Sequence, residues 1–319
     1  MPSMTQHPVS HITKMLLLGE SGSGKTGSLA SLVKAGYNLR ILDFDNGVDI
    51  YKNLLEGDTE ALGRITYETL TDKMKGVAGK SIPDGMPTAF SRATALLDRW
   101  QMKETLGPDG EVYPAYDLGQ ITSWGSNDVL VIDSLTMMAN AAMRWVLTVN
   151  NRPPGVKQLQ DYGAAQDMIE AVLQRLYCDA VKCNVIVISH VAYIGEENDM
   201  RGLPMALGKA LSPKIPRYFN TMLLCRTEGT GPGARRKIHT QPTGIVELKN
   251  TAPIGMPASF PLETGIADFF AIVQGKKATT NTTSTKTVVK PKASLKPVVL
   301  PQDNQALQIG LTDQPVSHV

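Results

Sequence analysis

Short apolar runs are the clearest pattern along this chain. Met15–Leu18, Val129–Ile132 and Val185–Ile188 contain no polar residue, and Leu39–Phe44 is a fourth, mixed run of strand length. A strand with one face in water alternates apolar and polar residues, whereas a strand covered on both faces is apolar throughout. The uniform runs therefore predict inner strands of a parallel sheet.

Between and after these runs, apolar residues recur at the three- and four-residue spacing of helices. One set is Phe90, Ala93, Leu97 and Trp100, the next is Met138, Ala141, Ala142, Trp145 and Val149, and the last is Leu159, Tyr162, Ile169, Val172 and Leu176. We interpret these stripes as core faces, the first with Thr88 or Ser91 as its N-cap. Further helices are expected over residues 25–35 and 266–273.

The pattern changes after residue 220. Residues 221–226, 237–241 and 245–249 are predicted strands joined by short, glycine-bearing turns, and such short links require antiparallel neighbours. A proline-rich segment, 253–261, follows them. Together the patterns predict an α/β fold, with a mainly parallel central sheet flanked by helices and extended by C-terminal antiparallel strands.

Composition divides the chain into three parts. Residues 1–13 are predicted to form a flexible N-terminus, and residues 14–275 are predicted to form one domain. Within that domain, residues 71–127 are an insertion. It is interpreted as a lid, a partner surface or a cover for the sheet edge. Residues 276–319 hold six lysines, two aspartates and no aromatic residue, which predicts a disordered basic tail, either a cationic tether or merely solubilising. The whole chain has a net charge of +2, so the domain is near −2 and is not a general nucleic-acid binder.

The cysteines and the apolar runs indicate where the protein works. Cys178, Cys183 and Cys225 have no metal-ligand spacing and stand in or beside apolar segments, so we expect reduced core thiols. No segment approaches the length of a membrane span, and none resembles a signal peptide. We therefore expect a cytoplasmic protein that makes no membrane contact.

The segment after the first strand has the spacing of a phosphate-binding loop. It consists of Gly19, Glu20, Ser21, Gly22, Ser23, Gly24, Lys25 and Thr26, the Walker A pattern, between a strand and a helix. The glycines let backbone N–H groups close around an anion. Lys25 is expected to reach the β- and γ-phosphates, and the Thr26 hydroxyl is a hard oxygen suited to Mg²⁺. The motif predicts binding of ATP and Mg²⁺.

Two aspartates follow predicted strands at the edge where open α/β sheets hold their ligands. Asp133 ends the run that begins at Asp128, the Walker B pattern, and is expected to hold Mg²⁺ together with Thr26. Asp45 follows the second strand, where it is either a general base that orients water or part of an Asx turn with Asn46-Gly47. The residues leave these two interpretations open.

His190 follows the last inner strand and is expected to face the γ-phosphate. It is predicted to sense the nucleotide, and the alternative is a structural histidine bonded to a loop carbonyl. The long segment 192–214 comes next, and long loops in compact domains are usually functional. Its cations Arg201, Lys209 and Lys214 are candidates for contacting a DNA backbone or a neighbour's γ-phosphate, with plain solvated charges as the alternative.

In these motifs the chain resembles the RecA-like division of P-loop ATPases. It is most similar to phage-encoded AAA-type ATP-binding proteins that assist single-strand DNA annealing and recombination. The resemblance covers about residues 12–275, and its carriers are the Walker A stretch and residues 42–47, 128–134, 161–163 and 187–191. RecA itself has Glu and Gln where this chain has Asp45 and His190.

The resemblance implies ATP hydrolysis, with Lys25, Asp133, Asp45 as water activator and His190 as γ-phosphate sensor. It also implies stimulation by single-stranded DNA bound at residues 192–214. Implied partners are further copies of the chain and a single-strand DNA-binding protein, in the host cytoplasm if the chain is phage-encoded. A nucleotide-gated interaction module and a small-molecule kinase are the alternatives, although the chain has no arginine-rich lid helix after the third strand.

Overall fold

A computed structural model of the chain describes residues 12–276, apart from residues 107–109, 154, 197–199 and 253 and the side chain of Lys209. The predicted flexible N-terminus up to residue 11 lies outside the described residues, as does the predicted basic tail from residue 277 on. All the described helices and strands lie between these two segments.

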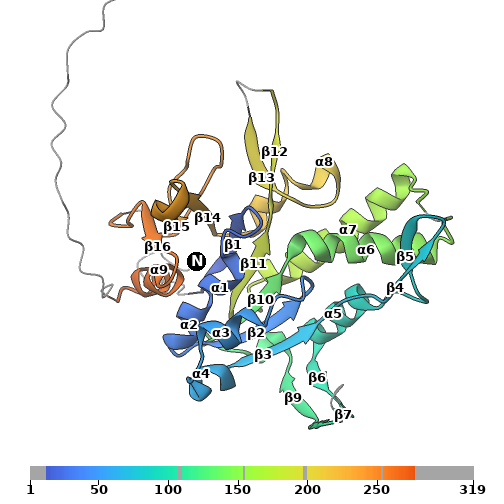
Figure 1. Ribbon diagram of the computed structural model, residues 1–319, viewed down its shortest axis with the longest axis horizontal. Coiled ribbons are helices and arrows are strands. Elements are labelled where there is room, and N and C mark those ends of the chain that lie inside the picture. Colours follow the sequence, from blue (N-terminus) through green and yellow to red (C-terminus); the bar gives the residue numbers. More distant parts are fainter. Residues whose placement is uncertain (1–11, 107–109, 154, 197–199, 253, 277–319) are drawn as a thin grey trace, which may run out of the picture. The chain divides into compact units, whose positions relative to one another are not determined.

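Within the described residues, an eight-stranded sheet forms the centre of the domain (Figure 1). Its strands are, in spatial order, β16 (Ser259–Pro261), β15 (Arg235–His239), β14 (Thr221–Glu228), β1 (Lys14–Gly19), β11 (Asn184–Ser189), β10 (Asp128–Asp133), β2 (Asn38–Asp43) and β3 (Ile65–Thr69). Pairing is parallel from β14 to β3 and antiparallel for β15 and β16. The predicted fold class is confirmed.

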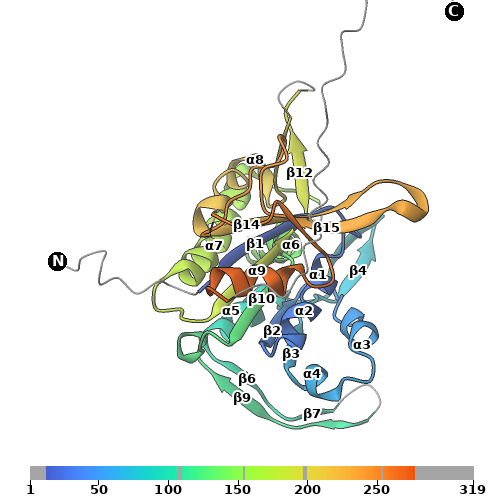
Figure 2. The same cartoon turned by 90° about the vertical axis from the view of Figure 1, so that its left-hand side faces the viewer.

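Helices cover both faces of this sheet (Figures 1 and 2). They are α1 (Lys25–Ser28), α2 (Ala30–Lys34), α3 (Ile50–Leu54), α4 (Thr59–Gly63), α5 (Ala89–Asp98), α6 (Leu135–Val149), α7 (Leu159–Tyr177), α8 (Gly208–Leu211) and α9 (Gly265–Val273). In β1, Met15 and Leu17 join the core formed with α2, α3, α4 and α9, while Leu16 and Leu18 join the core formed with α5, α6 and α7. Two separate cores explain why the inner strands are apolar throughout.

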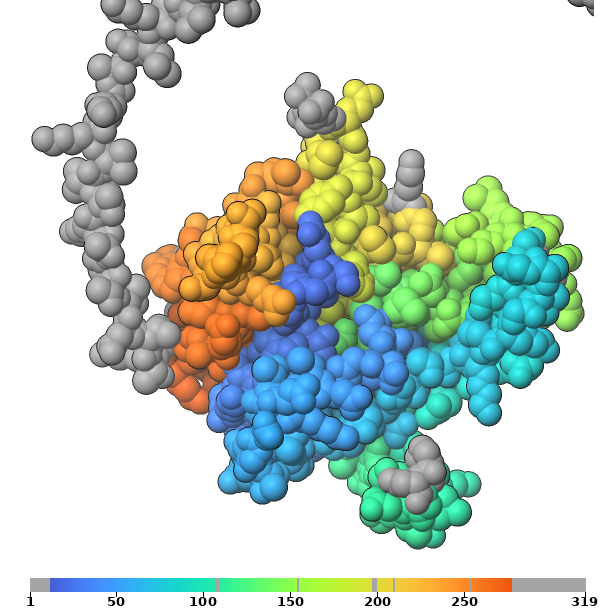
Figure 3. Space-filling model, in the orientation of Figure 1, coloured from blue at the N-terminus to red at the C-terminus, as the bar shows by residue number. Residues whose placement is uncertain are grey.

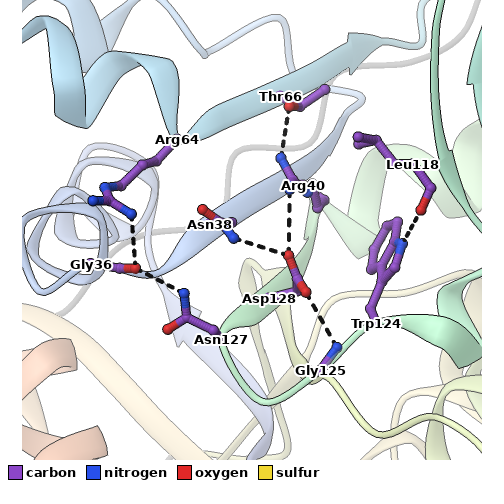
Figure 4. A network of polar contacts seen from close by, with 10 residues as sticks. All are labelled: Gly36, Asn38, Arg40, Arg64, Thr66, Leu118, Trp124, Gly125, Asn127 and Asp128. Atoms are coloured by element: carbon purple, nitrogen blue, oxygen red, sulfur yellow. Dashed lines mark hydrogen bonds and ion pairs between the residues drawn. The ribbon is translucent and has the colours of Figure 1, made fainter.

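A polar network ties together the starts of β2, β3 and β10 (Figure 4). The Asp128 carboxylate accepts hydrogen bonds from Asn38 Nδ2 at 3.3 Å and from an Arg40 guanidinium nitrogen at 3.4 Å. The register of β10 on β2 pairs Asp128 with Asn38 and, at the other end of the strands, Asp133 with Asp43. The network at the amino ends of these strands therefore helps to align Asp133 and Asp43 at their carboxyl ends.

Two helical predictions need correction. The helix expected over residues 25–35 is divided at Leu29 into α1 and α2. Ile169 of α7 is fully buried, as expected, but Leu159 at the first turn of α7 is 89% exposed and Val149 at the end of α6 is 53% exposed. Both exposed residues flank the connection between α6 and α7, where the helix ends extend beyond the packed core. Helical spacing identifies an apolar face but does not show where along the helix its packing stops.

The insertion 71–127 contains α5 and three antiparallel strand pairs. These pairs are β4 (Met74–Val77) with β5 (Lys80–Pro83), β6 (Trp100–Met102) with β9 (Tyr116–Gly119), and β7 (Thr105–Leu106) with β8 (Val112–Tyr113). Trp100, which was expected on the helix with Phe90, Ala93 and Leu97, opens β6 instead. Thr88 precedes α5, but the carboxylate that accepts from the first N–H groups belongs to Asp72.

The outermost strand comes from a different segment than predicted. Residues 245–249 form no strand and make only an isolated antiparallel bridge between Lys249 and Met222. Ile245 O accepts from Gly202 N at 2.9 Å, and Lys249 O accepts from Met222 N at 2.7 Å. These bonds hold the segment against β13 (Arg201–Pro204) and the start of β14. The neighbour of β15 is β16, which lies in the predicted proline-rich segment.

Two cysteines match the prediction and one does not. Cys183 and Cys225 are buried free thiols, whereas Cys178 is exposed just after α7. Among the described residues, no helix has the length and apolar character required to cross a bilayer.

The contrast between two positions of α7 provides a test of the packing. Ile169→Ala should lower the free energy of unfolding by about 2–4 kcal/mol, because it removes a fully buried side chain. Leu159→Ala, the matched control on the same helix, should change it by less than about 0.5 kcal/mol. Urea denaturation measures both values, and equal losses would contradict this placement of α7.

Candidate nucleotide-binding site

The loop between β1 and α1 has glycine at three positions where its path requires one. A Cβ on Gly19 would lie 2.5 Å from Ser23 Oγ and 2.7 Å from Cys225 O, so no side chain fits there. Gly22 and Gly24 have φ angles of +74° and +92°, which other residues rarely adopt. The loop therefore makes the tight turn that a phosphate-binding loop requires.

Lys25 points back into this loop. Its Nζ donates to Gly19 O at 3.0 Å and to Glu20 O at 2.8 Å. Burial lowers the pKa of Lys25, while the carboxylates of Asp133 and Asp45 act in the opposite sense. The side chain is a buried cation at the position where the motif places the β- and γ-phosphates.

Thr26 and Asp133 are in direct contact although 107 residues separate them. Thr26 Oγ1 donates to Asp133 Oδ2 at 2.6 Å. Burial raises the pKa of Asp133 to about 7, reinforced by nearby Asp45 and Asp43 and opposed by the Thr26 bond and Lys25. The two oxygens predicted to hold Mg²⁺ thus lie together in a region of concentrated negative charge.

Among the described residues, no cluster of three metal-ligating side chains occurs. A cage made only of protein groups is not what Mg²⁺ usually occupies, since it is commonly held by one or two side chains together with phosphate oxygens and water. Thr26 and Asp133 fit that arrangement.

Asp43, the last residue of β2, and Asp45, just after it, have separate tasks. Asp43 is fully buried and accepts from Gly47 N at 3.1 Å, so it is the residue that stabilises this turn. The sequence had offered Asp45 as the turn residue. Asp45 is exposed, and its Oδ1 accepts from Ser134 Oγ at 2.9 Å. Ser134 therefore holds the carboxylate that was predicted to orient water.

His190 is half-buried and lies beside α6. Its Nδ1 is 3.4 Å from Thr136 Oγ1, and the same hydroxyl lies 3.4 Å from the His190 backbone N. Burial lowers the pKa of His190, and Lys25 lowers it further, which favours a neutral imidazole at pH 7. The predicted sensing role remains a prediction.

Eight of the predicted site residues line one cleft of about 340 Å³: Ser21, Gly22, Gly24, Lys25, Thr26, Asp45, Asp133 and His190. They lie at or just after the carboxyl ends of β1, β2, β10 and β11, which meet at one edge of the sheet. In Figure 3 the dark blue of the phosphate loop reaches the surface between the yellow of β12 (Val191–Ile194) and β13 and the orange of β14 and β15. The structure thus gathers the predicted site residues, and their chemical roles remain predictions.

Three contributors to this site escaped the sequence analysis. Tyr51 is buried, donates its hydroxyl to Thr26 O at 3.0 Å, and has its pKa raised well above the ordinary value by burial. Ser134 supports Asp45, and Arg236 of β15 lines the cleft. Only Ser134, next to the Walker B aspartate, had a sequence signal that could have identified it.

The segment after His190 is more ordered than the predicted long loop. It contains the antiparallel pair β12 and β13, then α8. Arg201 opens β13 and is exposed, and the Lys209 side chain lies outside the described residues. Lys214 Nζ lies 3.6 Å from Glu170 Oε2, so a carboxylate already faces this predicted DNA contact.

The raised pKa of Asp133 predicts a pH-dependent stability. The folded protein holds this proton more tightly than the unfolded chain, so ionisation of Asp133 destabilises the fold as pH rises from about 4 to about 7. Asp133→Asn should therefore raise the Tm of the nucleotide-free protein, with a gain that grows across this interval and then levels off. Thermal scans from pH 4 to 8 measure it, with the exposed Asp49→Asn as control, and a gain independent of pH would contradict the assignment.

Comparison with known proteins gives the family. A family model described as an AAA domain matches residues 12–252. No curated protein matches the chain. The structural neighbours include the flagellar accessory protein FlaH from Methanocaldococcus jannaschii, at 10% identity and a TM-score of 0.37, covering 81% of this chain and 89% of that chain. Another is a KaiC-like protein from Pyrococcus horikoshii, at 11% identity and a TM-score of 0.37, covering 78% of this chain and 84% of that chain.

Neither of these structural likenesses indicates a substrate or a partner. The family model, in contrast, spans most of the described domain, and that domain has the loop and the mainly parallel sheet predicted for it. The chain therefore belongs to the AAA domain family, and its α/β domain carries a phosphate-loop motif after β1.

Proposed function

We propose that the protein hydrolyses ATP with Mg²⁺ and uses its nucleotide state to control contact with single-stranded DNA in recombination or strand annealing, as in the phage-encoded proteins it resembles. The contact between Thr26 and Asp133 carries the ATPase part, because it joins the two halves of a magnesium-nucleotide site within one cleft. The DNA part rests on family resemblance and on the strand pair that follows His190.

Hydrolysis at this site requires little covalent chemistry from the protein. Lys25 neutralises phosphate charge, while Thr26 and Asp133 would hold Mg²⁺, which supplies further charge neutralisation. Asp45, fixed by Ser134 through Oδ1, orients a water molecule and accepts its proton on the cleft side. The role of His190 is to report whether the γ-phosphate is present.

A hydrogen bond joins the phosphate loop to the proposed DNA-binding segment. Tyr193 of β12 donates its hydroxyl to Glu20 Oε1 at 3.1 Å. β12 begins one residue after His190, so the strand pair is connected to the cleft both through the chain and through this bond. A change in the loop on nucleotide binding has a direct route to β12 and β13.

The proposed DNA contacts are Arg201 and Lys209, with a lesser part for Lys214 because of its contact with Glu170. Further copies of the chain and a single-strand DNA-binding protein are the proposed partners, and the cytoplasm of a phage host is the proposed setting. Cations in the segment that follows His190 would bind the phosphates of any DNA sequence, as annealing requires.

Steady-state ATPase measurements test the catalytic part. Asp45→Asn should lower kcat by about 100-fold or more with a small change in KM, because it removes the group that acts on water. Asp49→Asn, four residues away on the N-terminal side of α3, should be within about twofold of the unmodified protein. Lys25→Ala serves as the blank, and full activity in that variant would refute the assigned site.

DNA dependence tests the other part. Single-stranded DNA should raise the ATPase rate, and the stimulation should shrink as salt increases because phosphate contacts release counterions. A rate that is indifferent to DNA would contradict the recombination role. Tight ATP binding with negligible turnover, with or without DNA, would instead indicate a nucleotide-gated interaction module.

Tyr193→Phe tests the link between the two parts. It removes one hydrogen bond of about 1 kcal/mol, so stimulation by DNA should fall by about fivefold while the rate without DNA stays within about twofold. Tyr67→Phe, at the exposed position of the edge strand β3, is the matched control. Unchanged stimulation in Tyr193→Phe would show that the Glu20 contact does not couple the sites.

A further inference from the structure

The nucleotide cleft is lined by a second cation that the proposed mechanism does not use. Arg236 of β15 lines the same cleft as Lys25. β15 lies on one side of β1 in the sheet, separated from it by β14, whereas β11, β10 and β2 lie on the other side. Arg236 therefore approaches the phosphate loop from the side opposite to Asp45, Asp133 and His190.

The main chain fixes where Arg236 stands. It is paired with Thr227 of β14, and its carbonyl accepts from Leu262 N at 3.3 Å. A Cβ on Gly24 would lie 3.4 Å from Arg236 Cδ and 2.4 Å from Leu262 Cδ2. The stem of Arg236 thus lies against the last glycine of the phosphate loop, next to Lys25.

Its guanidinium has no hydrogen bond or ion pair with any residue that the structure describes, unlike its neighbours in the strand. Arg235 donates to Pro232 O at 3.3 Å and to Ala234 O at 3.1 Å, and Lys237 pairs with Glu228 at 2.7 Å. Because successive side chains of a strand point to opposite faces of the sheet, Arg236 faces the side opposite to Arg235 and Lys237. A permanently charged guanidinium beside the buried Lys25 favours an anion with several charges.

We propose that Arg236 holds the α- and β-phosphates of the nucleotide bound to its own chain. The residues that act on the γ-phosphate and water lie beyond β1 on the β11 side, so the remainder of the nucleotide extends towards β14 and β15. A guanidinium matches the paired oxygens of such phosphates. This inference rests on the proposed nucleotide site and adds a binding residue to it.

Nucleotide binding, measured without turnover, tests the inference. In isothermal titration with Mg²⁺, Arg236→Ala should raise the dissociation constants of ADP and of a non-hydrolysable ATP analogue alike, by about 10- to 100-fold for a charged hydrogen-bonded contact. Arg236→Lys should give an intermediate loss, because it keeps the charge without the paired donors. Arg235→Ala, the matched control on the other face of the strand, should be within about twofold.

Each other outcome has a distinct meaning. If Lys25→Ala leaves binding unchanged, the proposed nucleotide site itself fails. If Lys25→Ala weakens binding and Arg236→Ala does not, only the present inference fails. A loss confined to the ATP analogue would place Arg236 at the γ-phosphate and overturn the assignment to the α- and β-phosphates.

A co-expressed mixture of the Lys25→Ala and Arg236→Ala chains tests whether Arg236 acts within its own chain. If it does, no site in the mixture has both cations, and tight binding stays absent. If Arg236 acted on a neighbouring copy, part of the sites would regain the unmodified affinity, and the inference would be overturned.

Discussion

The nucleotide cleft depends on one constraint, the parallel pairing of β2, β10, β11 and β1 in a sheet whose two faces are both buried. Parallel strands bring their carboxyl ends to the same edge, so the groups that follow them meet there. The register matters as much as the direction, because Asp133 is paired with Asp43 and Leu18 with Ser189. A slip of one residue would exchange the two cores of every inner strand, and the apolar packing resists that exchange.

This arrangement concentrates charge in a place where charge is costly. Asp43 and Asp133 are buried and Asp45 is near them, while Lys25 is the buried cation that opposes their repulsion. The raised pKa of Asp133 expresses that cost. A magnesium ion would neutralise the carboxylates, and the phosphates would pair with Lys25. The electrostatic cost of these buried charges would therefore be recovered when the nucleotide binds.

The phosphate loop is contacted by elements that come much later in the chain. Tyr193 of β12 bonds Glu20 near the start of the loop, and Arg236 of β15 lies against Gly24 near its end. The loop is thus connected to the proposed DNA-binding strands on one side and to the antiparallel edge of the sheet on the other. Any movement of the loop with nucleotide would bias both neighbours, which is the physical basis of a nucleotide-controlled contact.

The sequence by itself determined the elements whose signal is local. Uniform apolar runs predicted the inner strands, because burial on both faces excludes polar residues. The glycine spacing of the loop placed Gly19 and Thr26 in the predicted nucleotide site, and the acid at the end of a buried strand placed Asp133 there. Both signals lie within one short segment of chain. The family resemblance extended that prediction to a RecA-like P-loop domain.

Only the tertiary structure decided the rest, because those features depend on contacts between distant segments. It assigned the turn after β2 to Asp43 instead of Asp45, and it put β16 beside β15 where a nearer segment had been expected. It brought Tyr51 and Arg236 to the phosphate loop, although neither residue carries a spacing or composition signal. Local periodicity shows which faces must be buried, whereas the neighbour that covers each face is set by how the whole chain packs.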